Sequence, residues 1–124
     1  MSEGSAPRSP RRSGAALVID DSPVQRAHAV QLLRDCGCTE VLEADQGRSA
    51  LDLLARLPQG VRLIVLDLEM EGMNGIAFLE QLPGCDIPIV LCSSREQRLI
   101  DSVQTLGHDL GLNVVAALRK PLNS

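Results

Sequence analysis

The chain has 124 residues, of which 44% are hydrophobic and 23% charged, enough apolar material for one domain with a single core. No apolar run approaches the ~20 residues that a membrane-spanning helix needs, and the N-terminus lacks a signal-peptide core. We therefore expect a cytoplasmic protein without a membrane partner. A net charge of −4 and a single aromatic residue, Phe78, argue against nucleic-acid binding by the domain itself.

The first 14 residues differ in composition from the rest of the chain. They are rich in Ser, Pro, Gly and Arg without apolar periodicity, so residues 1–14 are expected to form a disordered tail ahead of a domain over residues 15–124. Three arginines and one glutamate give the tail a charge near +2. Because the total is −4, the domain is left near −6.

The four cysteines are Cys36, Cys38, Cys85 and Cys92, and their spacing matches no zinc site. Cys92 ends an apolar run, where a thiol usually packs as a small hydrophobic side chain. A metal or disulfide role is therefore not expected for these residues.

Five short aliphatic runs have the composition of buried strands. The run from Leu63 to Leu66 is unbroken rather than alternating, which is typical of a parallel strand covered on both faces. Strands alternate with segments of helical periodicity, and this alternation predicts an α/β fold with a doubly wound, five-stranded parallel sheet. The expected strands are residues 15–19, 40–44, 63–66, 87–92 and 113–118.

Four helices are expected between these strands. Ser22 and Pro23 suit an N-cap and a first helical position, and Gly37 is a natural stop for that helix. The second helix is expected from residue 45 or 46 to 57, the third from 74 to 82, and the fourth up to Gly111. The predicted apolar faces are Val24, Ala27, Val30 and Leu33 in the first helix, Ala50, Leu53, Leu54 and Leu57 in the second, Ile76, Phe78, Leu79 and Leu82 in the third, and Leu99, Val103, Leu106 and Leu110 in the fourth.

Polar side chains follow four of the five strands: Asp20 and Asp21, then Asp67, then Ser93, then Lys120. The carboxyl ends of parallel strands meet at one edge of a sheet, where α/β folds bind ligands. Three carboxylates in close contact repel, and one would take up a proton unless a cation were bound among them. Because all the acidic ligands are oxygens, the pattern favours Mg²⁺.

Each of these residues also has a structural interpretation. Asp20 and Asp21 could cap the first helix, and Asp67 could be a turn residue. Ser93 opens the capping-box pattern Ser-Ser-Arg-Glu. Lys120 could lie on the surface, although it is the only lysine in the chain.

The same residues resemble the receiver domain of bacterial two-component response regulators, which has an acidic pair, an aspartate, a Ser or Thr, and Lys-Pro after strands one, three, four and five. The resemblance covers residues 15–121 and implies a flavodoxin-like sheet with strand order 2-1-3-4-5. It implies that Asp67 is the phosphoacceptor, that Ser93 is the switch hydroxyl, and that Lys120 pairs with the phosphoryl group. The implied Mg²⁺ ligands are Asp21, Asp67 and the Glu69 carbonyl, with Asp20 in support.

The resemblance implies a role in phosphorelay signal transduction. A sensor histidine kinase would donate the phosphoryl group in a Mg²⁺-dependent reaction, and the altered domain would act on an output domain or a downstream protein. The domain itself would then not be an enzyme. Two alternatives stay open: a Mg²⁺-dependent phosphohydrolase with Asp67 as nucleophile, and an interaction module that does not depend on phosphorylation.

The sequence departs from the receiver pattern in the loop after Asp67, where Glu71 stands in place of the usual proline. Ala117 replaces an aromatic residue that often rotates when the switch hydroxyl moves, so the output must be transmitted differently. Glu69 and Arg95 each lie two positions after a site residue. We expect their side chains to pair across the mouth of the pocket and to slow dephosphorylation.

The C-terminal part is similar to receivers that precede cyclic-di-GMP phosphodiesterase (EAL) domains, in the pattern that begins at Leu106-Gly107 and in the long interval from Ser93 to Lys120. The chain stops at Ser124, where the resemblance places a fifth helix, so an apolar face of the sheet should be bare. We expect either a receiver truncated before that helix, whose parent continues into an output domain, or a homodimer that covers the face.

Overall fold

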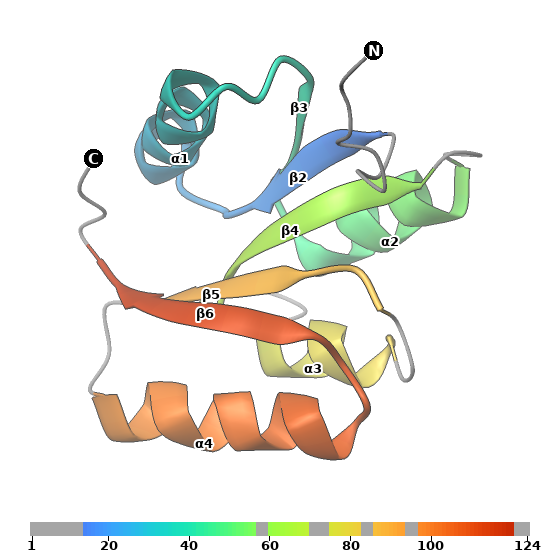
Figure 1. The fold of residues 1–124 in the computed structure, drawn as a ribbon, viewed down its shortest axis with the longest axis vertical. Coiled ribbons are helices and arrows are strands. Elements are labelled where there is room, and N and C mark those ends of the chain that lie inside the picture. Colours follow the sequence, from blue (N-terminus) through green and yellow to red (C-terminus); the bar gives the residue numbers. More distant parts are fainter. Residues whose placement is uncertain (1–13, 57–59, 70–74, 83–85, 94–96, 121–124) are drawn as a thin grey trace, which may run out of the picture.

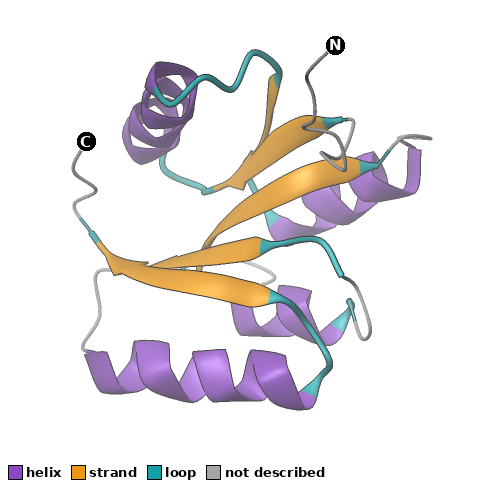
Figure 2. Cartoon of the chain, viewed as in Figure 1, coloured by secondary structure: helices purple, strands orange, loops and turns teal. Residues whose placement is uncertain are grey.

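A computed structural model describes residues 14–56, 60–69, 75–82, 86–93 and 97–120. These residues form strands and helices in strict alternation (Figure 1), and Figure 2 shows the helices around a single sheet. The predicted tail lies outside the described residues, except for Gly14. In chain order the elements are β2 (Ala15–Ile19), α1 (Pro23–Asp35), β3 (Val41–Ala44), α2 (Gly47–Arg56), β4 (Val61–Asp67), α3 (Gly75–Glu80), β5 (Ile89–Ser93), α4 (Gln97–Asp109) and β6 (Val114–Arg119).

The strands form one five-stranded sheet in the order β3-β2-β4-β5-β6, and all its pairs are parallel. In sequence order this is 2-1-3-4-5, so the predicted flavodoxin-like arrangement is confirmed. The chain leaves β2 and β6 at the same edge of the sheet (Figure 1). The register places Asp67 opposite Cys92 and Ser93 opposite Arg119, so the functional candidates follow strands that end at nearly the same level.

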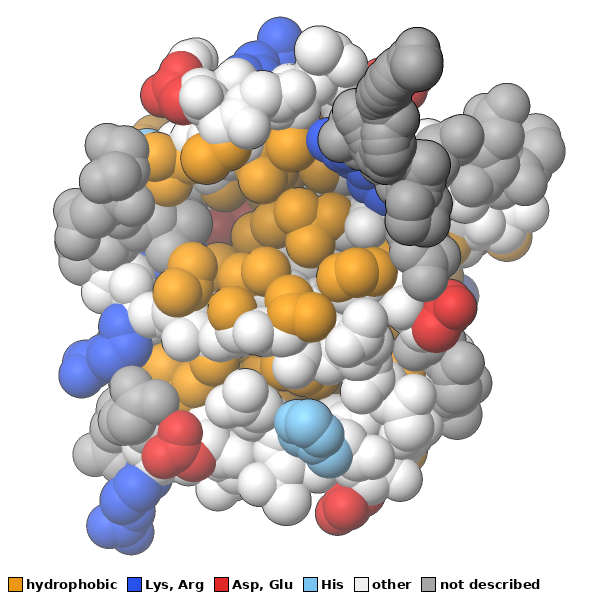
Figure 3. All heavy atoms as spheres, viewed as in Figure 1, with side chains coloured by type: hydrophobic (Ala, Val, Ile, Leu, Met, Phe, Trp, Pro, Cys, Tyr) orange, Lys and Arg blue, Asp and Glu red, His pale blue; other side chains and the backbone are white. Residues whose placement is uncertain are grey.

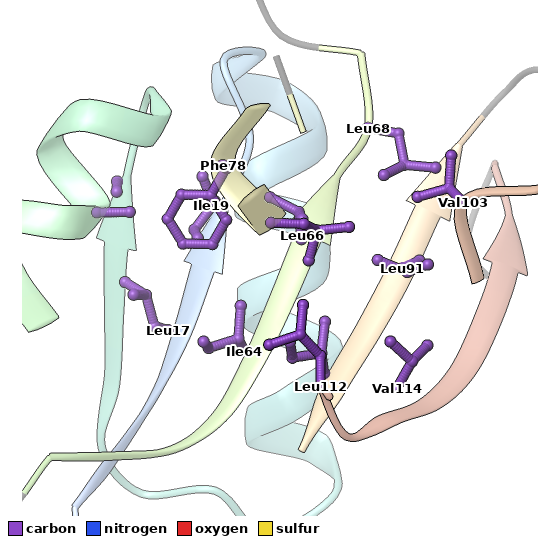
Figure 4. Packing of buried hydrophobic residues seen from close by; sticks show 14 of the residues in the cluster. Leu17, Ile19, Ile64, Leu66, Leu68, Phe78, Leu91, Val103, Leu112 and Val114 are labelled. Atoms are coloured by element: carbon purple, nitrogen blue, oxygen red, sulfur yellow. The ribbon is translucent and has the colours of Figure 1, made fainter. Parts of the chain in front are cut away.

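One face of the sheet is covered by α2, α3 and α4. Because side chains alternate along a strand, Ile64 and Leu66 of β4 enter this face while Leu63 and Val65 enter the other. Phe78 of α3 is completely buried in the larger cluster, beside strand residues such as Ile19 (Figure 4). This packing fixes the position of the central strand, and with it the position of Asp67.

The opposite face is covered by α1 over β2 and β4, and its apolar side chains continue across β5 and β6 (Figure 3). Leu118 on this face is 46% exposed. The predicted bare apolar face is therefore present in the described part of the chain. A hollow of about 160 Å³ on this face is lined by Ala29, Leu32, Leu33, Leu63, Val65, Val90, Cys92 and Leu118.

The predicted apolar face of α1 was partly wrong. Val24 is 80% exposed and Ala27 is exposed as well, whereas Ala29 and Val30 are buried. The predicted residues recur at a spacing of three, and each such step falls about 60° short of a full turn of an α-helix. A stripe of this kind winds around the helix, so its N-terminal members point away from the sheet.

Most other boundaries agree with the predictions within two residues, and Gly37 ends α1 with a positive φ of 100°. Ser22 caps α1 as predicted, because its side chain accepts a hydrogen bond from the Gln25 N–H. β5 begins at Ile89 rather than at residue 87, and Pro88 just before it has no N–H to donate to a neighbouring strand. The predictions for Leu57, Asn74 and the Leu99 side chain lie outside the described residues.

Gly75, the first residue of α3, makes a close approach that predicts a stability effect. A Cβ atom there would lie 2.7 Å from the Leu68 Cα and 2.9 Å from the Asp67 carbonyl oxygen. Gly75→Ala is expected to lower the free energy of unfolding by about 1–3 kcal/mol, because backbone atoms must move to relieve the clash. Urea denaturation measures this change.

Gly107→Ala in α4 is the matched comparison. The added Cβ would meet only the Val114 Cγ2, at 2.7 Å, and a side chain can shift more easily than a backbone. A smaller loss is therefore expected for Gly107→Ala. A neutral or stabilising effect of Gly75→Ala would contradict the close approach.

Candidate functional site

Three carboxylates meet at the carboxyl edge of the sheet. Asp20 and Asp21 directly follow β2, and Asp67 is the last residue of β4. One carboxylate oxygen from each lies within 4.8 Å of the others. Asp20 and Asp67 are only 4% and 3% exposed, while Asp21 is half-buried. The structure therefore brings together the acidic residues that the sequence singled out.

Lys120 extends from the end of β6 into this cluster. Its backbone N–H donates to the Ser93 carbonyl at 2.8 Å, which continues the register of β6 beside β5. The ammonium Nζ lies 2.9 Å from Asp20 Oδ2 and 3.2 Å from Asp67 Oδ1, and it also donates to the Gln25 side chain. With a side chain only 7% exposed, Lys120 is not a surface lysine.

The environment keeps Lys120 charged. Burial by itself would lower the pKa of the ammonium group, but the hydrogen bond to Asp20 and the charges of Asp67 and Asp20 raise it above the ordinary 10.5. The site therefore contains one permanent positive charge between two of its three carboxylates.

Asp67 is the carboxylate most affected by this environment. Burial raises the pKa of its carboxyl from the ordinary 3.8 to about 6, and the neighbouring charge of Asp20 acts in the same direction. The Glu69 N–H, which donates to Asp67 Oδ1 at 3.1 Å, and the charge of Lys120 both oppose the rise. One ammonium group thus compensates the cluster only partly.

Ser93 ends β5 and is fully buried beside the cluster. Its hydroxyl donates to Glu69 Oε2 at 2.6 Å. The pairing predicted for the Glu69 side chain was with Arg95, which lies outside the described residues together with the rest of the capping-box pattern. The contact that the structure describes instead links Glu69 to the residue at the end of the neighbouring strand.

The start of α1 fixes the loop that holds Asp20. The Ser22 N–H donates to Asp20 Oδ1 at 2.9 Å, so this carboxylate has a local structural role as well as its contact with Lys120. Arg26 donates to the Asp20 carbonyl at 2.7 Å and pairs with Glu43 of β3 at 3.0 Å. The loop is therefore tied both to its own helix and to the neighbouring strand.

Sequence reasoning missed Gln25, Arg26 and the contact of the Glu69 side chain with Ser93. A helix that begins directly after an acidic pair directs polar residues of its first turns back towards the strand end, and this position was the available signal for Gln25 and Arg26. The contact between Glu69 and Ser93 depends on the register of β4 and β5, which the sequence does not specify.

Cys92 is buried next to Ser93 and lies on the α1 side of the sheet. Burial raises the pKa of its thiol to about 11, so it remains protonated at neutral pH. Cys36, Cys38 and Cys92 are free thiols in the structure, and Cys85 lies outside the described residues.

Residues 16–124 of the chain match the response regulator receiver domain family. The chain belongs to that family. The match begins in the first strand of the sheet and includes every residue of the site described above.

Two curated relatives illustrate the similarity. The receiver is 34% identical over 109 residues to the cyclic di-GMP phosphodiesterase RocR of Pseudomonas aeruginosa, covering 86% of this chain but only 28% of RocR. It is 32% identical over 94 residues to the chemotaxis protein CheY of the same organism, covering 71% of this chain and 74% of CheY. The chain therefore spans about a quarter of the length of RocR.

Solved structures support the same fold. The chemotaxis protein CheY4 of Vibrio cholerae aligns with a TM-score of 0.71 and 27% identity, covering 90% of each chain. A probable two-component response regulator with a GGDEF domain aligns with a TM-score of 0.75 and 24% identity, covering 92% of this chain and 46% of that one. At 24% identity the second likeness shows the fold alone.

Family membership gives the receiver a general role. Receiver domains are non-enzymatic signalling domains that interact with histidine kinases and output domains, and they typically bind Mg²⁺ at an acidic pocket. Among the described residues, each helix is too short or too polar to cross a bilayer.

The acidic cluster fits a Mg²⁺ ion. Its carboxylates are hard oxygen donors, and oxygens of all three lie close enough together to bind one small cation. The raised pKa of Asp67 shows that Lys120 alone leaves negative charge uncompensated. A divalent cation at this position would relieve that repulsion.

Asp67→Asn is expected to stabilise the cation-free receiver. At pH 8 the buried carboxylate is ionised at a pKa about two units above its ordinary value, so its removal should raise the free energy of unfolding by about 1–3 kcal/mol, with the lower end allowing for solvent at the rim. Urea denaturation in the presence of a chelator measures this gain. Asp52→Asn on the exposed side of α2 is the control and should change little.

The pH dependence has a definite sign. The folded chain holds the Asp67 proton up to about pH 6, whereas the unfolded chain releases it near 3.8. The folded state therefore binds more protons in this window, and the contribution of Asp67 to stability falls as pH rises through it. The Asn variant should lack this fall, and an unchanged or lower stability at pH 8 would contradict the assignment.

Proposed function

We propose that this receiver accepts a phosphoryl group on Asp67 in a Mg²⁺-dependent reaction. The observation that carries the proposal is the meeting of Asp20, Asp21 and Asp67 with the ammonium group of Lys120 at one edge of the sheet. A buried carboxylate beside a fixed positive charge and a metal-binding pocket has what phosphoryl transfer requires, namely an aligned acceptor and compensation for the charge of the phosphoryl oxygens.

The residues divide into two groups by role. Asp21, Asp67 and the Glu69 carbonyl would hold Mg²⁺, with Asp20 in support. When bound, the ion supplies positive charge to the phosphoryl oxygens. Lys120 and the Ser93 hydroxyl would hold the remaining phosphoryl oxygens, because both reach the Asp67 end of the sheet from neighbouring strands.

The transfer itself needs no proton from the protein at Asp67. An Asp67 carboxylate oxygen forms the new bond to phosphorus while the bond between phosphorus and the donor atom breaks, and the donor keeps that electron pair. With a histidine kinase the donor atom is an imidazole nitrogen, and with acetyl phosphate it is an acetate oxygen. The ionised form of Asp67 is the nucleophile, so compensation of its negative neighbours favours the reactive state.

We infer that the partners are a sensor histidine kinase and an output domain or a downstream protein in the cytoplasm. The similarity to RocR supports a place in cyclic-di-GMP signalling. The signal would leave through the surface formed by α4 and β6, since Lys120 directly follows β6 and Ser93 precedes α4. Ala117 on β6 is small and half-buried against the core, so this surface would change without the rotation of an aromatic side chain.

Acetyl phosphate with Mg²⁺, followed by intact mass measurement, tests the proposed function. The expected result is one phosphoryl group per chain, lost on chelation of Mg²⁺ and abolished by Asp67→Asn. Asp52→Asn, with the same chemical change on the exposed side of α2, should leave the modification intact.

The other outcomes identify the two alternatives. Continuous release of phosphate without an adduct would indicate a phosphohydrolase. No reaction under any condition would indicate an interaction module that does not depend on phosphorylation.

A further inference from the structure

The buried hydroxyl of Ser93 is already engaged by a carboxylate. Ser93 Oγ donates to Glu69 Oε2 at 2.6 Å, a length typical of a charge-assisted bond between a hydroxyl and an ionised carboxylate. Such bonds are about twice as strong as bonds between neutral groups. A hydroxyl has a single proton, so Ser93 can donate to only one acceptor at a time.

Glu69 is held in place by the phosphoacceptor strand. The Leu68 N–H donates to the Cys92 carbonyl at 2.9 Å, which continues the pairing of β4 with β5 by one residue. The Glu69 N–H then donates to Asp67 Oδ1 at 3.1 Å. Glu69 therefore has its backbone on Asp67 and its side chain on Ser93, so one residue contacts both groups.

We propose that Glu69 is a positioning residue that holds the Ser93 hydroxyl in the unphosphorylated receiver and competes with the phosphoryl group for its proton. This inference rests on the proposed phosphorylation of Asp67. When Asp67 is modified, Ser93 must turn its hydroxyl from Glu69 to a phosphoryl oxygen, and the half-buried Glu69 carboxylate loses that hydrogen bond. Glu69 thus favours the unmodified state, and its removal favours the modified one.

The experiment separates this competition from simple repulsion between charges. Glu69→Ala removes the carboxylate but keeps the backbone carbonyl, and Ser93→Ala removes the hydroxyl for which the two acceptors compete. The wild type, both single variants and the double variant form a double-mutant cycle. The probe is beryllofluoride with Mg²⁺, a phosphoryl mimic that requires no transfer step, and calorimetry measures its affinity.

Glu69→Ala is expected to bind beryllofluoride about tenfold more tightly than the wild type, the worth of one charge-assisted hydrogen bond. In the Ser93→Ala background the same change should alter affinity by less than about twofold. Glu69→Gln keeps an acceptor oxygen without the charge, so its affinity should fall between those of the wild type and Glu69→Ala. Glu80→Ala, which removes an exposed carboxylate at the end of α3, is the charge control and should have no effect.

An equal gain in both backgrounds would show that charge repulsion acts without Ser93 and would overturn the proposal, as would the absence of any gain. These outcomes differ from failure of the proposed function, in which the wild type would take up neither beryllofluoride nor a phosphoryl group from acetyl phosphate, and both proposals would fall together.

A second measurement uses the receiver without Mg²⁺ or phosphoryl mimic. If the hydrogen bond exists, the losses of stability in urea caused by Glu69→Ala and Ser93→Ala should not add, because either substitution removes the same bond. Additive losses would contradict the contact on which the proposal stands.

Discussion

The ion pairs of Lys120 with Asp20 and Asp67 hold together a site whose charges would otherwise repel one another. Burial of carboxylates is unfavourable unless a partner compensates them, and here one ammonium group serves three. The raised pKa of Asp67 is the visible consequence. The site is thus strained electrostatically in a way that a divalent cation relieves, and this strain joins metal binding, protonation and reactivity of Asp67 in one equilibrium.

The sheet makes this arrangement possible. In a parallel sheet the strand ends lie at one edge, and the register fixes which ends are neighbours. The Lys120 N–H on the Ser93 carbonyl and the Leu68 N–H on the Cys92 carbonyl extend this register past the strands themselves. Side chains separated by 100 positions, Asp20 and Lys120, are consequently in contact. Apolar packing around Phe78 supplies stability that the charged edge does not.

The sequence predicted the features that depend on strand and helix patterning. The strand order and the meeting of Asp20, Asp21, Asp67 and Lys120 follow from polar residues placed at the ends of aliphatic runs. The buried face of α1 was predicted incorrectly, because a three-residue repeat does not keep to one side of a helix. The contact between Glu69 and Ser93 could not be predicted, because it depends on which neighbours the local register brings within reach.

The titration of the Asp67 carboxyl carbon by NMR, with and without Mg²⁺, tests the central claim most directly. The account predicts an apparent pKa near 6 in the absence of divalent cations, because burial and Asp20 outweigh Lys120. Saturating Mg²⁺ should lower that pKa, since the cation favours the ionised carboxylate. An ordinary pKa that does not respond to Mg²⁺ would show that the carboxylates neither repel one another nor share a cation, and would contradict the account.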